Sequence, residues 1–218
     1  HSMGLPIRDI VEGCEEGFSS YRDEAMSTAQ LVYQIQTKGI QRLYFVANSY
    51  LVYALLKALE PLLEESLNGE NQCFKIKILT FESLKSHYLE HILSCNDRDM
   101  FFILNQRTPS QRLQVPIHLP QKIKDDSYLG KELQFLNKQS FSDYDSATIE
   151  ALQYQIKKNE SSFIHLQYPI NDFNTLGLLM AYFYYFSCYS SWLRGYDVLN
   201  DPPFAEFDRL IWKFIKKY

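Results

Sequence analysis

The chain has 218 residues, of which 46% are hydrophobic and 22% charged, and its formal net charge is −4. This composition is typical of a globular protein with a sizeable core. Nucleic acids and anionic membrane surfaces attract proteins through fields of lysine and arginine, which this sequence lacks, so we expect neither as a partner.

The first residues and the cysteines bear on where the protein works. Residues 1–4 resemble the remainder of a cleaved expression tag, so we take the domain to begin at Leu5. The four cysteines have neither the close spacing of zinc sites nor the density of disulfide-rich secreted domains; they are Cys14, Cys73, Cys95 and Cys188. Reduced thiols and a cytoplasmic location are therefore expected.

The N-terminal third begins with helical spacing of its hydrophobic residues. This spacing predicts two helices between residues 7 and 36, meeting near residues 19–22. Lys38 and Gly39 are expected to end the second helix, with the glycine at positive φ. The hydrophobic run over 42–47 then predicts a buried strand.

Strands and helices continue to alternate along the rest of the chain. A helix over 50–64 is expected to be capped by Asn48 or Ser49. The later elements are predicted as strand 75–80, helix 83–93, strand 100–104, helix 147–158, strand 163–168, helix 171–193 and helix 204–216.

This alternation predicts an α/β fold, because parallel strands need long crossovers that helices supply. We expect a three-layer sandwich in which helices cover both faces of a parallel sheet of about four to five strands. Ligands of such sheets bind beyond the carboxyl ends of the strands, here near residues 48–50, 80–82 and 105–107. The uncharged stretch 176–193 is nearly long enough to cross a bilayer, but its serines and tyrosines favour a helix buried within a domain.

Few sequence motifs in this chain indicate a specific enzyme class or a metal site. Ser49 lacks the glycines of a nucleophile elbow, and no glycine-rich phosphate or dinucleotide loop follows a strand, which disfavours those enzyme classes. His87 and His91 lie four residues apart on a predicted helix with Glu90 between them. A metal site would need a further ligand that the sequence does not single out, so we predict no metal.

A pair of glutamates, Glu64 and Glu65, lies at the predicted end of a helix before a polar loop. Most such carboxylates are merely solvated. A carboxylate at the negative end of a helix dipole is nevertheless suited to act as a base. Both interpretations stay open on the residues alone.

Several stretches resemble, in order and spacing, the second sugar-isomerase (SIS) domain of bacterial glucose-6-phosphate isomerases. They are residues 5–6, 11–17, 38–39 with the strand containing Val46, 65–66, 98–101, and 174–177 through 194–195. Together they cover about Leu5 to Leu210. The resemblance implies one C-terminal SIS-like domain over residues 5–218, acting on a hexose phosphate in glycolysis and gluconeogenesis without metal or organic cofactor.

The resemblance also implies roles for individual residues. Glu65 would be the base that moves a proton between C1 and C2 of an enediolate, and His87 would help to open the sugar ring. The family's catalytic lysine falls on Asp208, or on Arg209 if one residue is inserted. Two substrate-binding positions in the same stretch would be Asp201 and Glu206.

Parts of the family's active site belong to a preceding SIS domain, which supplies the phosphate cradle and an arginine that stabilises the enediolate. We therefore expect negligible isomerase activity from this chain alone. The family also makes a homodimer the default expectation. Two alternatives are a non-catalytic module of the same fold that binds a sugar phosphate or a protein partner, and an unrelated α/β domain. A domain interface could be lined by aromatic residues that we expect to be exposed: Tyr182, Tyr185, Tyr189 and Trp192.

Overall fold

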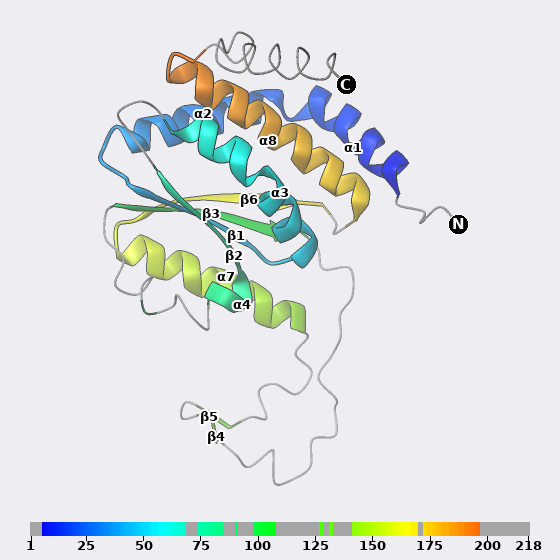
Figure 1. Ribbon diagram of the computed structural model, residues 1–218. Helices are drawn as coiled ribbons and strands as arrows, with labels where there is room; N and C mark the ends of the chain where they lie inside the picture. Colours follow the sequence, from blue (N-terminus) through cyan, green and yellow to red (C-terminus); the bar gives the residue numbers. More distant parts are fainter. Residues whose placement is uncertain are drawn as a thin grey trace, which may run out of the picture. The chain divides into compact units, whose positions relative to one another are not determined.

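A single parallel β-sheet organises the protein. The computed structural model describes residues 6–68, 74–84, 90, 98–107, 127–128, 131–132, 141–169 and 172–196 (Figure 1). The sheet has the order β2-β1-β3-β6. Its strands are β1 (Arg42–Ala47), β2 (Lys75–Thr80), β3 (Asp99–Gln106) and β6 (Ser162–Tyr168). The sheet is parallel and flanked by helices, so the predicted three-layer α/β fold is confirmed.

The helices follow the predicted pattern with shifted ends. They are α1 (Ile7–Ser20), α2 (Arg22–Gln36), α3 (Tyr50–Leu67), α4 (Phe81–Ser83), α7 (Phe141–Lys158) and α8 (Phe173–Leu193). Helix α7 begins at Phe141 rather than at the predicted Ala147, and α3 continues through Pro61 to Leu67. A short antiparallel pair, β4 (Ser127–Tyr128) and β5 (Lys131–Glu132), lies in the long connection after β3. The predicted helix 204–216 and most of helix 83–93 lie outside the described residues.

Tertiary contacts divide the chain into two compact units. The first, here called the α8 unit, contains the residues up to Leu43, Ala54–Ile78 and the residues from Asp172 onward. The second, here called the β6 unit, contains Tyr44–Tyr53 and Leu79–Asn171. The single domain predicted for residues 5–218 stays a prediction.

The α8 unit depends on a close crossing of α1 and α8. Glycines face each other there: a Cβ on Gly177 would lie 2.1 Å from the Ile10 carbonyl oxygen, and one on Gly13 would lie 2.0 Å from the Asn174 oxygen. The two backbones therefore approach as closely as only glycine allows. Asp172 fixes the start of α8, because its side chain accepts a 2.8 Å hydrogen bond from the Thr175 amide.

Helix α8 is largely a core helix. Ten of its residues are buried, from Thr175 to Ser190, as expected for an uncharged helix inside a domain. Tyr182 is one of them, at 1% exposure, and its hydroxyl donates to Thr28 Oγ1 over 2.9 Å. The expectation that Tyr182 is exposed was therefore wrong, because α2 covers this side of α8. None of the helices in the described ranges is long and apolar enough to cross a membrane.

The core of the β6 unit is aromatic and aliphatic. Stacked rings join neighbouring strands: Tyr44 pairs with Phe101 at 5.0 Å and Phe45 with Phe102 at 5.2 Å between centroids. Successive residues of a strand point to opposite faces, so the two ring pairs anchor both faces of β1 and β3. Both strands are consequently hydrophobic almost throughout, which is typical of the central strands of a parallel sheet.

Candidate functional site

Polar side chains gather in the β6 unit where β1 gives way to α3. Ser49 caps the helix: its Oγ accepts hydrogen bonds from the Leu51 amide at 3.1 Å and the Val52 amide at 3.5 Å. The amides that a bound anion would use at this helix start are thus already satisfied. Asn48 is held in place by its backbone amide, which donates to the Leu104 carbonyl over 3.1 Å.

Tyr168, the last residue of β6, reaches the same place. Its hydroxyl donates to Asn48 Oδ1 over 2.7 Å, and its side chain is only 2% exposed. Burial raises the pKa of Tyr168 to about 12, although a hydrogen bond with Ser49 partly opposes this. Tyr168 therefore stays a neutral donor and acceptor at physiological pH.

The backbone of Arg107 lies beside this tyrosine. The Arg107 amide donates to the Tyr168 carbonyl over 2.7 Å, which fixes Arg107 just beyond the carboxyl end of β3. Its side chain is exposed and has no hydrogen-bond partner within the described ranges. Asn48 Nδ2 likewise donates to none of the described residues. We call Asn48, Ser49, Arg107 and Tyr168 the strand-end cluster. It offers amide and hydroxyl groups for sugar hydroxyls and one cation for an anionic group.

A second polar network of the β6 unit serves the structure. Gln153 Nε2 donates to His165 Nδ1 over 2.9 Å, which leaves His165 Nε2 to donate to Asn105 Oδ1. The imidazole is then neutral, and burial lowers its pKa. Asn105 Nδ2 in turn donates to the Gln106 carbonyl over 3.2 Å. Since each group already has a partner, we interpret the network as a link between α7 and the sheet.

Replacing Tyr168 by phenylalanine should lower the free energy of unfolding by about 1 kcal/mol at pH 8, because Asn48 Oδ1 loses its donor. An unfolded tyrosine ionises near pH 10, whereas Tyr168 in the folded protein ionises only near pH 12. The wild type therefore loses stability as pH rises from 10 to 12, and the phenylalanine variant lacks this loss. We expect wild type and Tyr168→Phe to have equal free energies of unfolding at about pH 11.

Urea unfolding of both proteins between pH 8 and 11 measures this crossover. Tyr154→Phe is the matched control, because Tyr154 is 70% exposed. A difference between wild type and Tyr168→Phe that does not change with pH would contradict a buried, neutral Tyr168.

Glu65 lies in the α8 unit, in the last turn of α3, and its carboxylate is exposed. Its neighbour Ser66 is buried, with Oγ donating to the Leu63 carbonyl over 3.2 Å. The other predicted catalytic and binding residues lie outside the described residues; these are His87, Asp201, Glu206 and Arg209. The distance between Glu65 and His87 is therefore untested.

The strand ends expected to bind ligands lie where the sequence predicted them, since β1, β2 and β3 end at Ala47, Thr80 and Gln106. Tyr168 was missed as a candidate. It is the last residue of the predicted strand 163–168, so its position at a carboxyl strand end was a usable signal. Its hydrogen bond to Asn48, 120 positions away, had no signal in the sequence.

Comparisons with known proteins support the fold alone. No protein-family model matches the chain, and no curated protein matches its sequence significantly. Among solved structures, the chain is similar to the hypothetical protein TT0462 from Thermus thermophilus, with a TM-score of 0.70 and 16% sequence identity. The match covers 97% of this chain and 51% of that chain, so this chain spans about half the length of its structural neighbour.

Proposed function

We propose that this chain binds a hexose phosphate and is the Glu65-bearing, C-terminal half of an aldose-ketose isomerase of the glucose-6-phosphate isomerase type. The proposal rests first on the sequence resemblance over residues 5–210. The parallel α/β fold is compatible with it.

The observation that carries the binding part is the strand-end cluster. It combines the Arg107 guanidinium with the neutral groups of Asn48 and Tyr168 at the edge of the sheet where ligands of parallel sheets bind. A guanidinium forms charge-assisted hydrogen bonds with phosphate, and amide and hydroxyl groups hydrogen-bond to sugar hydroxyls. A phosphorylated sugar matches both kinds of group, whereas an unphosphorylated sugar uses only the neutral ones.

Arg107→Gln should weaken fructose 6-phosphate binding by about tenfold, because one charge-assisted contact is lost. Isothermal titration of the 218-residue chain measures this, with unphosphorylated fructose as the ligand control. Arg98→Gln is the matched protein control, because Arg98 is also exposed but precedes β3, at the amino end of the same strand. Equal losses in the two variants, or no binding by the wild type, would reject the strand-end cluster as a sugar-phosphate site.

The catalytic part assigns the proton transfer to Glu65. We expect negligible turnover by this chain alone, because the resemblance assigns the arginine that stabilises the enediolate to another domain. In the protein as its gene encodes it, Glu65→Gln should lower kcat for fructose 6-phosphate at least about 100-fold, since glutamine cannot accept a proton.

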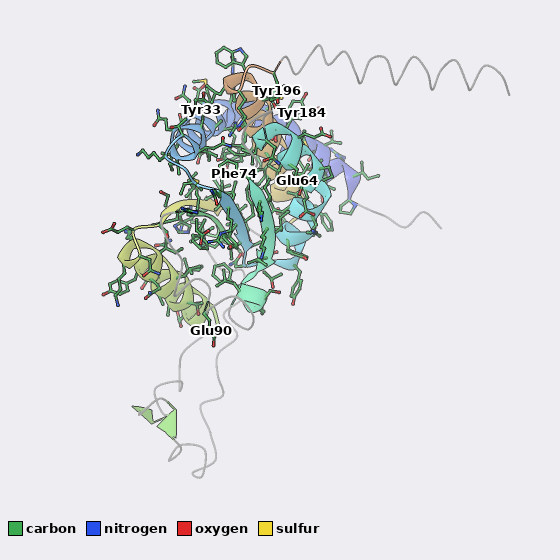
Figure 2. The ribbon with its side chains drawn as sticks, turned by 60° about the vertical axis from the view of Figure 1, so that its left-hand side comes forward. Tyr33, Glu64, Phe74, Glu90, Tyr184 and Tyr196 are labelled. Carbon is green, nitrogen blue, oxygen red and sulfur yellow. The ribbon has the colours of Figure 1, made fainter. Side chains whose placement is uncertain are left out.

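Glu64→Gln is the matched control for Glu65→Gln. Glu64 is the preceding residue of α3 and is also exposed on the surface of that helix (Figure 2). The Glu64→Gln variant should keep the wild-type kcat, because the resemblance gives Glu64 no catalytic role. Equal activity of the Glu64 and Glu65 variants would remove Glu65 from the mechanism. Binding of fructose 6-phosphate without turnover in any form of the protein would instead favour the non-catalytic module.

A further inference from the structure

Strand β6 forms an edge of the parallel sheet. Within the described sheet it pairs with β3 alone, in one continuous parallel register, and β2 forms the opposite edge. An edge strand presents unpaired N–H and C=O groups, and monomeric proteins protect such edges with charged side chains, prolines or bulges. The presence or absence of this protection indicates which edge can pair with another chain.

The two edges differ in this protection. Strand β2 carries two exposed lysines, Lys75 and Lys77. Strand β6 reads Ser-Phe-Ile-His-Leu-Gln-Tyr, so it contains no lysine, arginine, carboxylate or proline, and its register with β3 has no bulge. Its histidine, His165, is neutral, since burial lowers the pKa of the imidazole. The β6 edge is therefore open to pairing, whereas the β2 edge is protected.

The backbone of β6 shows which residues face the open edge. The N–H and C=O groups of one residue point to the same side of a strand, and those of the next residue point to the other side. The Tyr168 carbonyl accepts from the Arg107 amide over 2.7 Å, so Tyr168 and every second residue before it face β3. Phe163, His165 and Gln167 therefore face outward. Their backbone groups have no hydrogen-bond partner in the part of the chain that the structure describes.

A second copy of β6 is complementary to these outward groups. When two copies of the strand run antiparallel about a two-fold axis at His165, each His165 faces the same residue of the other copy. Phe163 of one copy then faces Gln167 of the other. Residues that face each other with outward groups in an antiparallel pair exchange both backbone hydrogen bonds. In this one register, every outward N–H and C=O group of Phe163, His165 and Gln167 finds a partner in both copies.

Helix α7 adds charge complementarity beside the same axis. Gln153 Nε2 donates to His165 Nδ1 over 2.9 Å, which places Gln153 level with the axis. Glu150 and Lys157 are exposed and lie three residues before and four residues after Gln153, so they share its side of α7. The Lys157 ammonium lies 5.6 Å from the centroid of the Phe163 ring, which confirms that this side faces β6. Since a two-fold axis reverses the order of residues, Glu150 of one copy faces Lys157 of the other.

We propose that the protein forms a symmetric dimer in which the β6 strands of two copies pair antiparallel about His165. The pairing joins the two parallel sheets into one continuous sheet, and ion pairs between Glu150 and Lys157 form on both sides of the axis. One strand edge and one helix layer make a small interface, so the association is expected in the micromolar range.

Gln167→Pro tests the backbone pairing, with Gln167→Ala as its matched control. Proline removes the outward N–H of residue 167, which an edge strand tolerates because that group has no partner in the single copy. Sedimentation velocity of the 218-residue chain should show wild type and Gln167→Ala passing from monomer to dimer between about 1 and 100 µM, and Gln167→Pro monomeric throughout. Circular dichroism verifies that each variant is folded. A dimer that Gln167→Pro leaves intact would overturn the proposal. A wild type that stays monomeric would also overturn it and would leave the edge to an extended segment of another protein.

Charge reversal tests the register without changing the strand. Glu150→Lys places like charges opposite each other across the axis, and so does Lys157→Glu, so each should weaken dimerisation about tenfold at low salt. The variant with both changes restores opposite charges and should recover the wild-type dissociation constant. If the double variant dimerises no better than the single variants, Glu150 and Lys157 do not face each other and the register about His165 is wrong.

Discussion

Gly177→Ala is expected to lower the free energy of unfolding by about 3 kcal/mol, an unusually large effect for one added methyl group. A Cβ at this position would lie 2.1 Å from the Ile10 carbonyl oxygen and 2.7 Å from the Cys14 amide nitrogen. Both are backbone atoms, so no side chain can rotate away, and α1 and α8 must separate. Alanine also favours helices over glycine by about 1 kcal/mol, so the helical preference alone predicts the opposite sign.

Gly39→Ala is the control that separates packing from backbone strain. Gly39 adopts a φ of +96°, but a Cβ there meets no atom within 4 Å. The expected loss is therefore limited to the cost of a left-handed conformation, about 1 kcal/mol. Thermal and urea unfolding of both variants give the comparison. A stability of Gly177→Ala equal to or above that of the wild type would contradict the close crossing of α1 and α8.

Arg194→Met should lower the free energy of unfolding by about 2 kcal/mol, because the Ser190 carbonyl and Gln36 Oε1 lose a charged hydrogen-bond donor at the meeting point of three helix ends. Arg194 Nη1 donates to the Ser190 carbonyl over 2.7 Å, and Nη2 donates to Gln36 Oε1. Gln36 Nε2 then donates to the Leu67 carbonyl over 3.4 Å. The three helix ends are the last residue of α2, Gln36, the last residue of α3, Leu67, and the last residue of α8, Leu193.

The surroundings of Arg194 offset part of the cost of burying its charge, although its buried Nε has no hydrogen-bond partner among the described residues. The C-terminal ends of helices carry partial negative charge, and the guanidinium lies 5.6 Å from the centroid of the Tyr33 ring. Burial lowers the pKa of Arg194 to about 10, which still leaves the side chain charged at neutral pH. Tyr33 and Tyr196 lie at the same end of the α8 unit (Figure 2).

Lys38→Met is the control for Arg194→Met, because Lys38 is an exposed cation just after α2. Its stability change should stay within about 0.5 kcal/mol. Arg194→Lys keeps the charge but cannot reach two acceptors with one planar group, so an intermediate loss is expected. If Arg194→Met were as stable as Lys38→Met, the packing of the three helix ends would not depend on the Arg194 cation.

The candidate site could be predicted only in part. The ends of the predicted strands indicated residues 48–50 and 105–107 as ligand-binding positions. These ranges contain three members of the strand-end cluster: Asn48, Ser49 and Arg107. Tyr168 joins them through a contact 120 positions along the chain, and only the order of the strands brings these residues together. The roles of Glu65 and His87 come from the resemblance alone.

The sequence by itself determined the local structure of this protein. Hydrophobic spacing predicted the strands of the parallel sheet and the helices α1, α2, α3 and α8. The Lys38-Gly39 pair predicted the turn at positive φ. These signals act between residues close in the chain. The tertiary structure alone decided which glycines touch backbone, where Arg194 finds its acceptors and which aromatic rings of α8 are buried. Those contacts join residues far apart in the chain, and their energies depend on how the elements pack rather than on the spacing within any one of them.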